Sequence, residues 1–463
     1  MSYQIVDINV SQTISATPSN LQQKAAFLSY GYTSAQIGIP YLITNIKDYN
    51  DITQIQIVSY TAETNSANTE TTLYISYPED VKLPYEKGEN IQLIISGCYP
   101  EKPWNGAQSG EISEKLSNTI VCKWLGSWDS ETSPSILGKF TFTGDYAEGI
   151  NPYELTEDVR IFFSQGANIG AYILELGPIS TTVEELAQEQ LKRLIAYVQE
   201  PEERIYSYQL TEAISALDET RAFAKQYEAP DAMQYFFVKV KDTNPYKTIK
   251  SAPAMTFKRK LTPDTLKDPC PSGAFLWNYV SPSPSEVNKV PPMSFRYLRG
   301  VDALKEKDSI LQKYDSDFIN YVGTGAEGGI SNTILLKGVF SDGNDATYWY
   351  SVDWVQINVK QALANAIING SNNPINPLYY NQDGIDRLQI VAQNVMNSGI
   401  SYGLINPDIT GGVTVNAIPF KEYITNNPTD YAIGRYAGLS VEYAPNRGFT
   451  KIIFNINVTL QAA

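Results

Sequence analysis

Histidine is absent from the 463 residues of this sequence. Histidine is the commonest general base, the commonest side-chain ligand of transition metals and the usual partner of a nucleophilic serine or cysteine. Carboxylate or lysine chemistry stays open, but we expect no enzyme, no metal and no cofactor. Cysteine is scarce as well, and the spacing of Cys98, Cys122 and Cys270 fits neither a disulfide framework nor a zinc site.

Long apolar runs are missing too. No stretch approaches the ~20 apolar residues of a membrane-spanning helix. The opening MSYQIVDINV lacks the basic region and apolar core of a signal peptide, so we expect the chain to stay in the cytosol that made it. The net charge is −15 and the only basic run is Lys258-Arg259-Lys260. Neither nucleic acid nor an anionic membrane surface is therefore an expected direct partner.

The composition is that of a folded, multidomain protein. Hydrophobic residues make up 43% and charged residues 18% of the sequence, and domains of ~100–200 residues predict two to four of them. Tyrosine is abundant at 32 residues. Its ring buries area while its hydroxyl stays hydrated, which suits subunit contacts. Replacement of phenylalanine in the cores explains the same count equally well.

Both ends of the chain show a clear period of two, which predicts half-buried strands. Polar residues alternate with apolar ones near the start and, more strongly, at the end of the chain. The apolar positions are Val6, Ile8 and Val10 at the start, and Phe454, Ile456, Val458 and Leu460 at the end.

The interior predicts a mixed α/β or α+β fold. Short apolar runs separated by Pro, Gly, Asn and Ser clusters between residues 30 and 177 indicate an all-β module. From Thr181 the apolar residues follow a helical period, and a second helix is expected at 211–228 before the strand YFFVKV at 235–240. Residues 243–299, rich in Pro and Ser, are interpreted as an irregular connection or a surface excursion.

The final third predicts two helices among short strands. ILLKGVF is expected as a strand, and TYWYSVDW as a strand or turn that passes into a helix ending at Gly370. A second amphipathic helix runs from about Ile385 to Gly399. VTVNAI and LSVEYA are further predicted strands.

The motifs that suggest chemistry stand in unfavourable contexts. Residues 323–328, GTGAEG, match a dinucleotide-binding pattern, but a predicted strand follows where a helix is needed. A calcium loop starting at Asp342 lacks the required glycine and the final glutamate, so a polar turn is favoured. Carboxylate pairs such as Glu184/Glu185 and Glu202/Glu203 lie at predicted helix ends, where solvation is the ordinary interpretation.

Several stretches in order along the chain resemble contractile phage tail sheath proteins. FFSQGANIGAYILELG at 162–177 is similar to a family phrase of two phenylalanines, a Gly-rich turn and an aliphatic strand, although Glu175 stands where the family often has arginine. WYSVDW with its following helix resembles the opening of the family's C-terminal core domain. YYNQDGIDRLQ through SYGLI, and the closing strand after YAPNRG, also fit. Residues 50–150 and 243–320 share hardly anything with the family.

The resemblance implies a β-rich outer insertion and an α/β C-terminal core domain with exchanged terminal strands. The implied divisions are an N-terminal arm at 1–20, a β-rich outer domain at 21–180, an α/β middle domain at 181–325, a core domain near the tail tube at 326–448, and a C-terminal arm at 449–463. The arms would pair with core sheets of neighbouring subunits, because an unpaired strand edge is a template for another chain. The alternative, in which both terminal strands pair within their own subunit, stays open.

The implied function is that of a structural subunit polymerising as a helical tube around an inner tail tube and contracting to drive it through the host envelope during genome ejection. The implied partners are further copies of the chain in six-fold rings, the tail tube protein, and baseplate and tail terminator proteins. The virion would be assembled in the host cytoplasm. Asp383, Asp386 and Arg387 are candidate tube-facing residues. Alternatives are another self-assembling tail component (tube or baseplate) and a carboxylate-based glycosidase.

Overall fold

The computed structural model describes residues 20–67, 69–99, 104–125, 135–142, 152–166, 169–179, 183–257, 270–283, 289–324 and 332–449. The chain divides into two compact units. Unit 1 takes its described residues from Met1–Gln22, Pro282–Ser294 and Asn344–Ala463, and unit 2 from Gln23–Ser281 and Phe295–Gly343. Multidomain, mixed α/β architecture is thereby confirmed.

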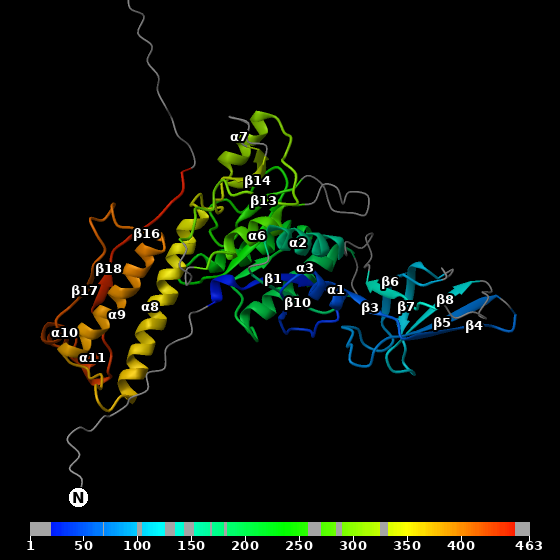
Figure 1. The fold of residues 1–463 in the computed structure, drawn as a ribbon, viewed down its shortest axis with the longest axis horizontal. Coiled ribbons are helices and arrows are strands. Elements are labelled where there is room, and N and C mark those ends of the chain that lie inside the picture. The colour runs from blue at the N-terminus through cyan, green and yellow to red at the C-terminus, as the bar shows by residue number, and fades with distance from the viewer. Residues whose placement is uncertain are drawn as a thin grey trace, which may run out of the picture. The chain divides into compact units, whose positions relative to one another are not determined.

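Unit 2 is built on an eight-stranded sheet in the order β15-β14-β13-β12-β11-β1-β10-β2 (Figure 1). The inner neighbours pair in parallel, while β2 and β15 close the two edges antiparallel. The strands are β1 (Ala25–Ser29), β2 (Tyr41–Ile43), β10 (Ala171–Glu175), β11 (Ser207–Gln209), β12 (Tyr235–Val240), β13 (Ala254–Thr256), β14 (Ile319–Thr324) and β15 (Thr333–Leu336).

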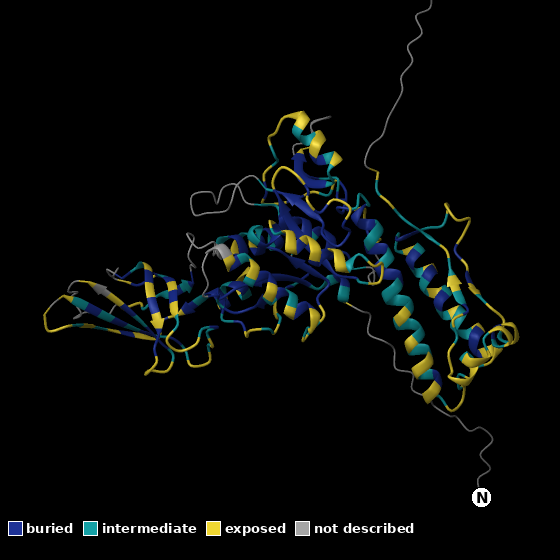
Figure 2. Cartoon of the chain, turned by 180° about the vertical axis from the view of Figure 1, so that it is seen from behind, coloured by how far each residue is buried: buried dark blue, intermediate teal, exposed yellow. Residues whose placement is uncertain are grey.

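Four of the inner strands, β1, β11, β12 and β13, are buried along their whole length, as Figure 2 shows for the central sheet. Parallel strands covered on both faces give continuous apolar runs rather than alternation, which explains AAFLS and YFFVKV. The helices of this unit are α1 (Ile46–Thr53), α2 (Pro152–Gln165), α3 (Val183–Gln199), α4 (Glu212–Ser215), α5 (Asp218–Ala224), α6 (Ser272–Val280) and α7 (Asp308–Ser316), with the 3₁₀ turn η2 (Lys225–Tyr227). The 3₁₀ turn η1 (Leu21–Gln23) spans the point in the sequence where unit 1 passes into unit 2.

Two local predictions for unit 2 are wrong. The helix expected at 211–228 is broken into α4, α5 and η2, and Thr211 caps α4 through its side chain. Residues 243–299 are not merely a connection, because they supply the inner strand β13 and the buried helix α6. Three-residue β13 is too short to show a period, and α6 is apolar on nearly every side.

An antiparallel seven-stranded sheet, here called the β module, is inserted into unit 2 in the order β3-β9-β6-β7-β8-β5-β4. Its strands alternate buried and exposed positions, visible as stripes in Figure 2. This β-rich insertion is confirmed. Its strands are β3 (Gln54–Gln56), β4 (Ser59–Thr64), β5 (Glu70–Ser76), β6 (Asn90–Ser96), β7 (Gly106–Ile112), β8 (Thr119–Leu125) and β9 (Lys139–Phe142).

The β module is narrower than the domain expected at 21–180. β1, β2 and β10 lie inside that range but pair in the large sheet with strands from beyond residue 180. The sheet therefore crosses the expected boundary, since βαβ connections bring distant segments of the chain into one layer. Within the β module, one face packs on a core of Leu73, Ile75, Leu93, Ile120 and Phe140.

Unit 1 is organised around two long helices, α8 (Ala346–Asn372) and α9 (Gln382–Ser401). The strand or turn expected at TYWYSVDW is the first part of α8, because the Asp345 side chain accepts a hydrogen bond from the Thr347 N–H and starts the helix there. The remaining elements are β16 (Ile405–Asn406), β17 (Val415–Ala417), α10 (Phe420–Asn426), α11 (Pro428–Ala432), β18 (Leu439–Val441) and β19 (Ala444–Pro445). Among the helices that the structure describes, none combines the length and apolar character needed to span a membrane.

Candidate functional site

The predicted arm residues lie outside the described part of the chain. They are Val6, Ile8, Val10, Phe454, Ile456, Val458 and Leu460. Most of the GTGAEG motif does as well, but the strands on its two sides, β14 and β15, pair antiparallel with Gly323 opposite Ile334. A dinucleotide loop joins a strand to a helix. The motif therefore connects two antiparallel strands, which is the wrong context for a phosphate site.

The structure brings the three predicted tube-facing residues together at the first turns of α9. Asn381 caps this helix by accepting a hydrogen bond from the Gly384 N–H at 2.9 Å. The Asp383 side chain is 77% exposed, and its carboxylate lies 3.9 Å from the Arg387 guanidinium. Asp386 is exposed as well. The two carboxylates are therefore available to another molecule.

Arg387 has a second role that the sequence did not indicate. Its guanidinium donates hydrogen bonds to the Asn376 side-chain oxygen at 3.1 Å and to the Pro377 carbonyl at 3.0 Å. The loop that precedes α9 is thus held against the helix by Arg387. Its charge is partly used inside the subunit, which leaves Asp383 and Asp386 as the freer members of the predicted set.

An aromatic cluster that the sequence analysis missed lies beside the start of α9. Its rings pack at centroid distances between 4.7 and 6.2 Å and belong to Tyr380, Phe420, Tyr423, Tyr431 and Tyr436. The backbone N–H of Phe420 donates to the Gln382 side chain, which fixes α10 against α9. Tyr431 is 51% exposed. The only signal in the sequence was the recurrence of tyrosine through residues 423–436.

Two short ladders in unit 1 leave strand edges open. β16 pairs only with β19, and β17 only with β18, among the described residues. The far side of β17 is occupied, because the Gln393 side chain bonds the Val415 N–H at 2.8 Å and the Gln389 side chain bonds the Val415 carbonyl at 2.7 Å. This leaves β18 as the outer strand of its ladder. An edge of this kind is a place where another strand adds through main-chain hydrogen bonds.

Unit 2 contains a buried ionic cluster under its large sheet. The Lys239 ammonium donates to Glu154 at 2.5 Å and to Asp158 at 2.6 Å, and the three side chains are 2%, 11% and 7% exposed. Burial alone would lower the pKa of Lys239, but the charges of Asp158 and Glu154 outweigh it and raise that pKa. Burial raises the pKa of Asp158 to about 7. The cluster ties α2 to β12 in the middle of the unit.

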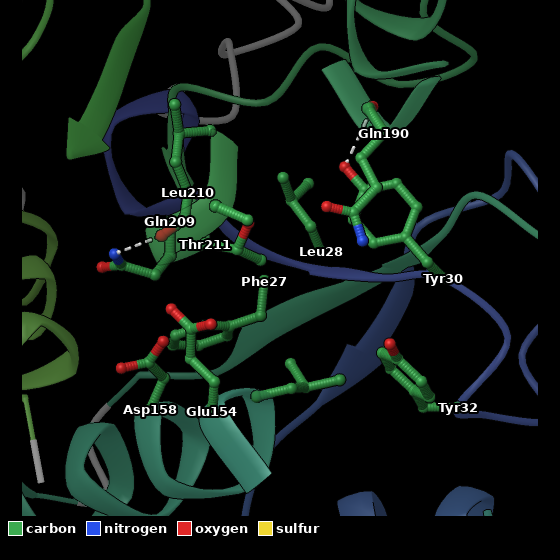
Figure 3. Close-up of a pocket in the computed structure, with 12 residues that line it drawn as sticks. Phe27, Leu28, Tyr30, Tyr32, Glu154, Asp158, Gln190, Gln209, Leu210 and Thr211 are labelled. Atoms are coloured by element: carbon green, nitrogen blue, oxygen red, sulfur yellow. Dashed lines mark hydrogen bonds between the residues drawn. The ribbon is translucent and has the colours of Figure 1, made fainter. Parts of the chain in front are cut away.

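The cavity beside this cluster is too small for a substrate. Figure 3 shows Glu154 and Asp158 on one side of it and Gln190 with Tyr30 on the other. Its volume is about 20 Å³, which is the room that about one water molecule needs. The cluster therefore braces the fold and has no space beside it for catalysis.

Glu175, where the resembling family often has arginine, is fully buried at the end of β10. Its carboxylate accepts hydrogen bonds from the Ser29 hydroxyl and the Gly31 N–H, both at 2.6 Å, and from the Gly177 N–H at 2.8 Å. Burial raises the pKa of Glu175, and these hydrogen bonds oppose the rise. The side chain thus fixes the loops that follow β1 and β10, which is a structural role.

The glycosidase alternative would need a general acid, and the buried Asp158 with its raised pKa lies beside a cavity that holds only about one water molecule. A general acid of that kind needs a carboxyl group kept protonated by burial. A wide hollow on the β module is lined by carboxylates of which Glu63, Glu111 and Glu114 are exposed. Within the described residues, no group of three or more Cys, Asp or Glu side chains is placed to hold a metal ion.

No family model matches the sequence, and no curated protein matches it either. Several solved structures are similar to the chain. A chain in the 6-fold symmetrised baseplate of the anti-feeding prophage is similar with a TM-score of 0.55 and 12% identity, over 98% of both chains. A chain of the same baseplate in its contracted state gives 0.52 and 12%, over 100% of both. The sheath tail protein Lin1278 from Listeria innocua gives 0.40 and 9% over 91% of both, a score too low to establish a common fold.

Proposed function

The chain has, over its whole length, the fold of a component of a contractile particle, and from this we propose that it is a tail sheath subunit. Copies of it would polymerise as a helical tube around an inner tail tube and contract to drive that tube through a host envelope. The observation that carries the proposal is the end-to-end likeness to a chain of a particle that has a contracted state. The partners would be further copies in six-fold rings, the tail tube protein, and baseplate and terminator proteins, in a virion tail assembled in the host cytoplasm.

Strand exchange between subunits fits the open edge of β18. The terminal arms at 1–20 and 449–463 contain, at 6–10 and 454–460, the alternation of apolar and polar residues that a donated strand needs. A contact made in this way is heterologous, and repetition of a heterologous contact that does not close produces a helix. The arms would keep neighbouring subunits connected while the rigid units rotate during contraction.

The start of α9 is the proposed contact with the inner tube, within the region 326–448 that would lie nearest to it. Exposed Asp383 and Asp386 give a polar contact of modest strength, since exposed ion pairs contribute ~0.2–1 kcal/mol each. Repetition in every ring would add these small contributions into firm attachment. The β module would then lie on the outside of the tube, where its sequence is free to vary.

Electron microscopy of the purified protein tests the proposal. Wide hollow cylinders are expected, because the sheath must enclose a tube. The second candidate is a baseplate component, favoured by the fact that the similar chains belong to a baseplate. If the protein forms only discs or short rings even when tail tubes are added, the result would support that candidate and contradict the sheath. A protein that stays monomeric at every concentration and salt would contradict both.

A further inference from the structure

The solvent-facing side of the β module carries a polar groove of about 900 Å³. It extends over β4, β5, β7 and β8, with Asn90 of β6 at one end. The opposite face of the same sheet packs on the apolar core of the module. The groove is therefore formed by the outward half of each alternating strand and stands on a rigid, fully hydrogen-bonded support.

The strand register arranges the side chains of the groove in rows. One row crosses five strands through directly opposed residues: Thr61, Tyr74, Val121, Glu111 and Asn90. The next row places Glu63, Thr72 and Lys123 side by side. Adjacent strands lie ~4.8 Å apart, so hydroxyl, amide, carboxylate and ammonium groups alternate at short intervals around one half-buried tyrosine ring.

The groove lacks what a protein partner or a nucleic acid would need. The centre of a protein interface is apolar and aromatic, whereas Leu116 is the one large apolar side chain of the groove among those markedly exposed. Nucleic acids and anionic glycans need basic groups. Here four glutamates, Glu63, Glu70, Glu111 and Glu114, face two lysines, Lys115 and Lys123.

We propose that this groove binds a neutral oligosaccharide. Sugar hydroxyls act as donors and acceptors at once, so they match a surface that mixes carboxylates, amides, hydroxyls and ammonium groups. The electron-rich face of Tyr74, second in the row between Thr61 and Val121, is the surface on which the C–H groups of a sugar ring stack. An open groove also suits an extended chain rather than a small, enclosed ligand. The inference does not depend on the proposed sheath function.

The test is migration of the full-length protein through native gels that contain a neutral polysaccharide: a β-glucan, a mannan or a galactan. We expect retardation by at least one of the three and none by heparin. Tyr74→Ala should weaken the retained complex about threefold to tenfold, the loss expected for one aromatic contact. Tyr74→Phe should keep the binding, because the ring remains.

Tyr99→Ala is the matched control. Tyr99 is an exposed tyrosine of the same module that does not line the groove, so its loss should change nothing. Absence of retardation in all three neutral polysaccharides, or equal retardation of Tyr74→Ala and the wild type, would overturn the proposal. Binding of oligolysine that disappears with salt and depends on Glu111 would overturn it in favour of a basic peptide. Cylinder formation should be normal in Tyr74→Ala, which keeps this outcome separate from that of the proposed function.

Discussion

Removal of the Lys239 charge tests whether the buried ionic cluster holds unit 2 together. Lys239→Met keeps the unbranched stem of the side chain but leaves Glu154 and Asp158 without their cation. Both carboxylates are nearly inaccessible to water. Breaking a buried pair in this way costs about 3–5 kcal/mol, and the loss of two charged hydrogen bonds at ~1.5–3 kcal/mol each gives an overlapping range of about 3–6 kcal/mol.

The pH dependence of this loss follows from the protonation of Asp158. In the wild type, burial raises the pKa of Asp158 from 3.8 to about 7. The folded state binds the Asp158 proton more tightly than the unfolded state does. This difference stabilises the folded state fully below pH ~4, and the contribution is lost as the pH rises through 7. Each pKa unit corresponds to ~1.36 kcal/mol. Without the opposing charge of Lys239, Asp158 should hold its proton to higher pH, so the substitution should be mild near pH 5 and reach its full effect near pH 8.

Hydrogen exchange followed by mass spectrometry measures the effect locally. Peptides covering α2 and β12 should lose about 3–5 kcal/mol of protection at pH 8, while peptides from α9 in unit 1 serve as an internal reference. Lys241→Met is the matched control, because Lys241 is exposed just beyond the same strand. Adding Glu154→Gln and Asp158→Asn to Lys239→Met should restore most of the protection, since no unpaired charge remains buried. A loss below about 1 kcal/mol, or no recovery in the triple variant, would refute the reasoning.

Three further outcomes follow from unit 1 and the arms. Deletion of 449–463 should leave a folded, soluble subunit that forms no long cylinders, because each donated apolar side chain contributes ~1.5–3 kcal/mol to assembly. Sizing columns and electron microscopy would check this, and normal cylinders would contradict strand exchange. Reversal of both charges in Asp383→Lys/Asp386→Lys should weaken co-sedimentation with tail tubes and lower the melting temperature only slightly, because Asp383 stands in the first turn of α9; co-sedimentation unchanged across a range of salt would count against the tube contact. Gly384→Ala should lower the melting temperature of unit 1 in calorimetry, since its Cβ would lie 1.9 Å from the Tyr379 carbonyl oxygen; an unchanged transition would show that the loop moves aside freely.

The sequence predicted those parts of the fold whose signal is local. The alternation in TTLYISY and IQLIISGCY indicated the β module because each of these strands has one wet face. The helical period from Val183 onward gave α3, and the pattern from Ile385 to Gly399 gave α9, because each helix presents one apolar stripe.

The parts that were missed depend on distant partners. YFFVKV is readable as a strand, but nothing near Lys239 in the sequence shows that its ammonium meets two carboxylates 81 and 85 positions away. β13 is a strand only because β12 and β14 flank it. The aromatic cluster likewise brings Tyr380 to residues 40 to 56 positions further along the chain. Such contacts belong to the tertiary structure, which periodicity does not encode.

The first and last strands of the β module are neighbours, with Gln54 opposite Thr141 and Gln56 opposite Lys139. The module's first and last strands thus begin and end one strand spacing apart, ~4.8 Å. A module attached in this way is interchangeable: another compact domain with adjacent termini could replace it without stretching β2 or α2. Each subunit could then carry a fused enzyme, epitope or fluorophore at residues 54 and 142, and this site is where we would begin to engineer a particle that displays cargo.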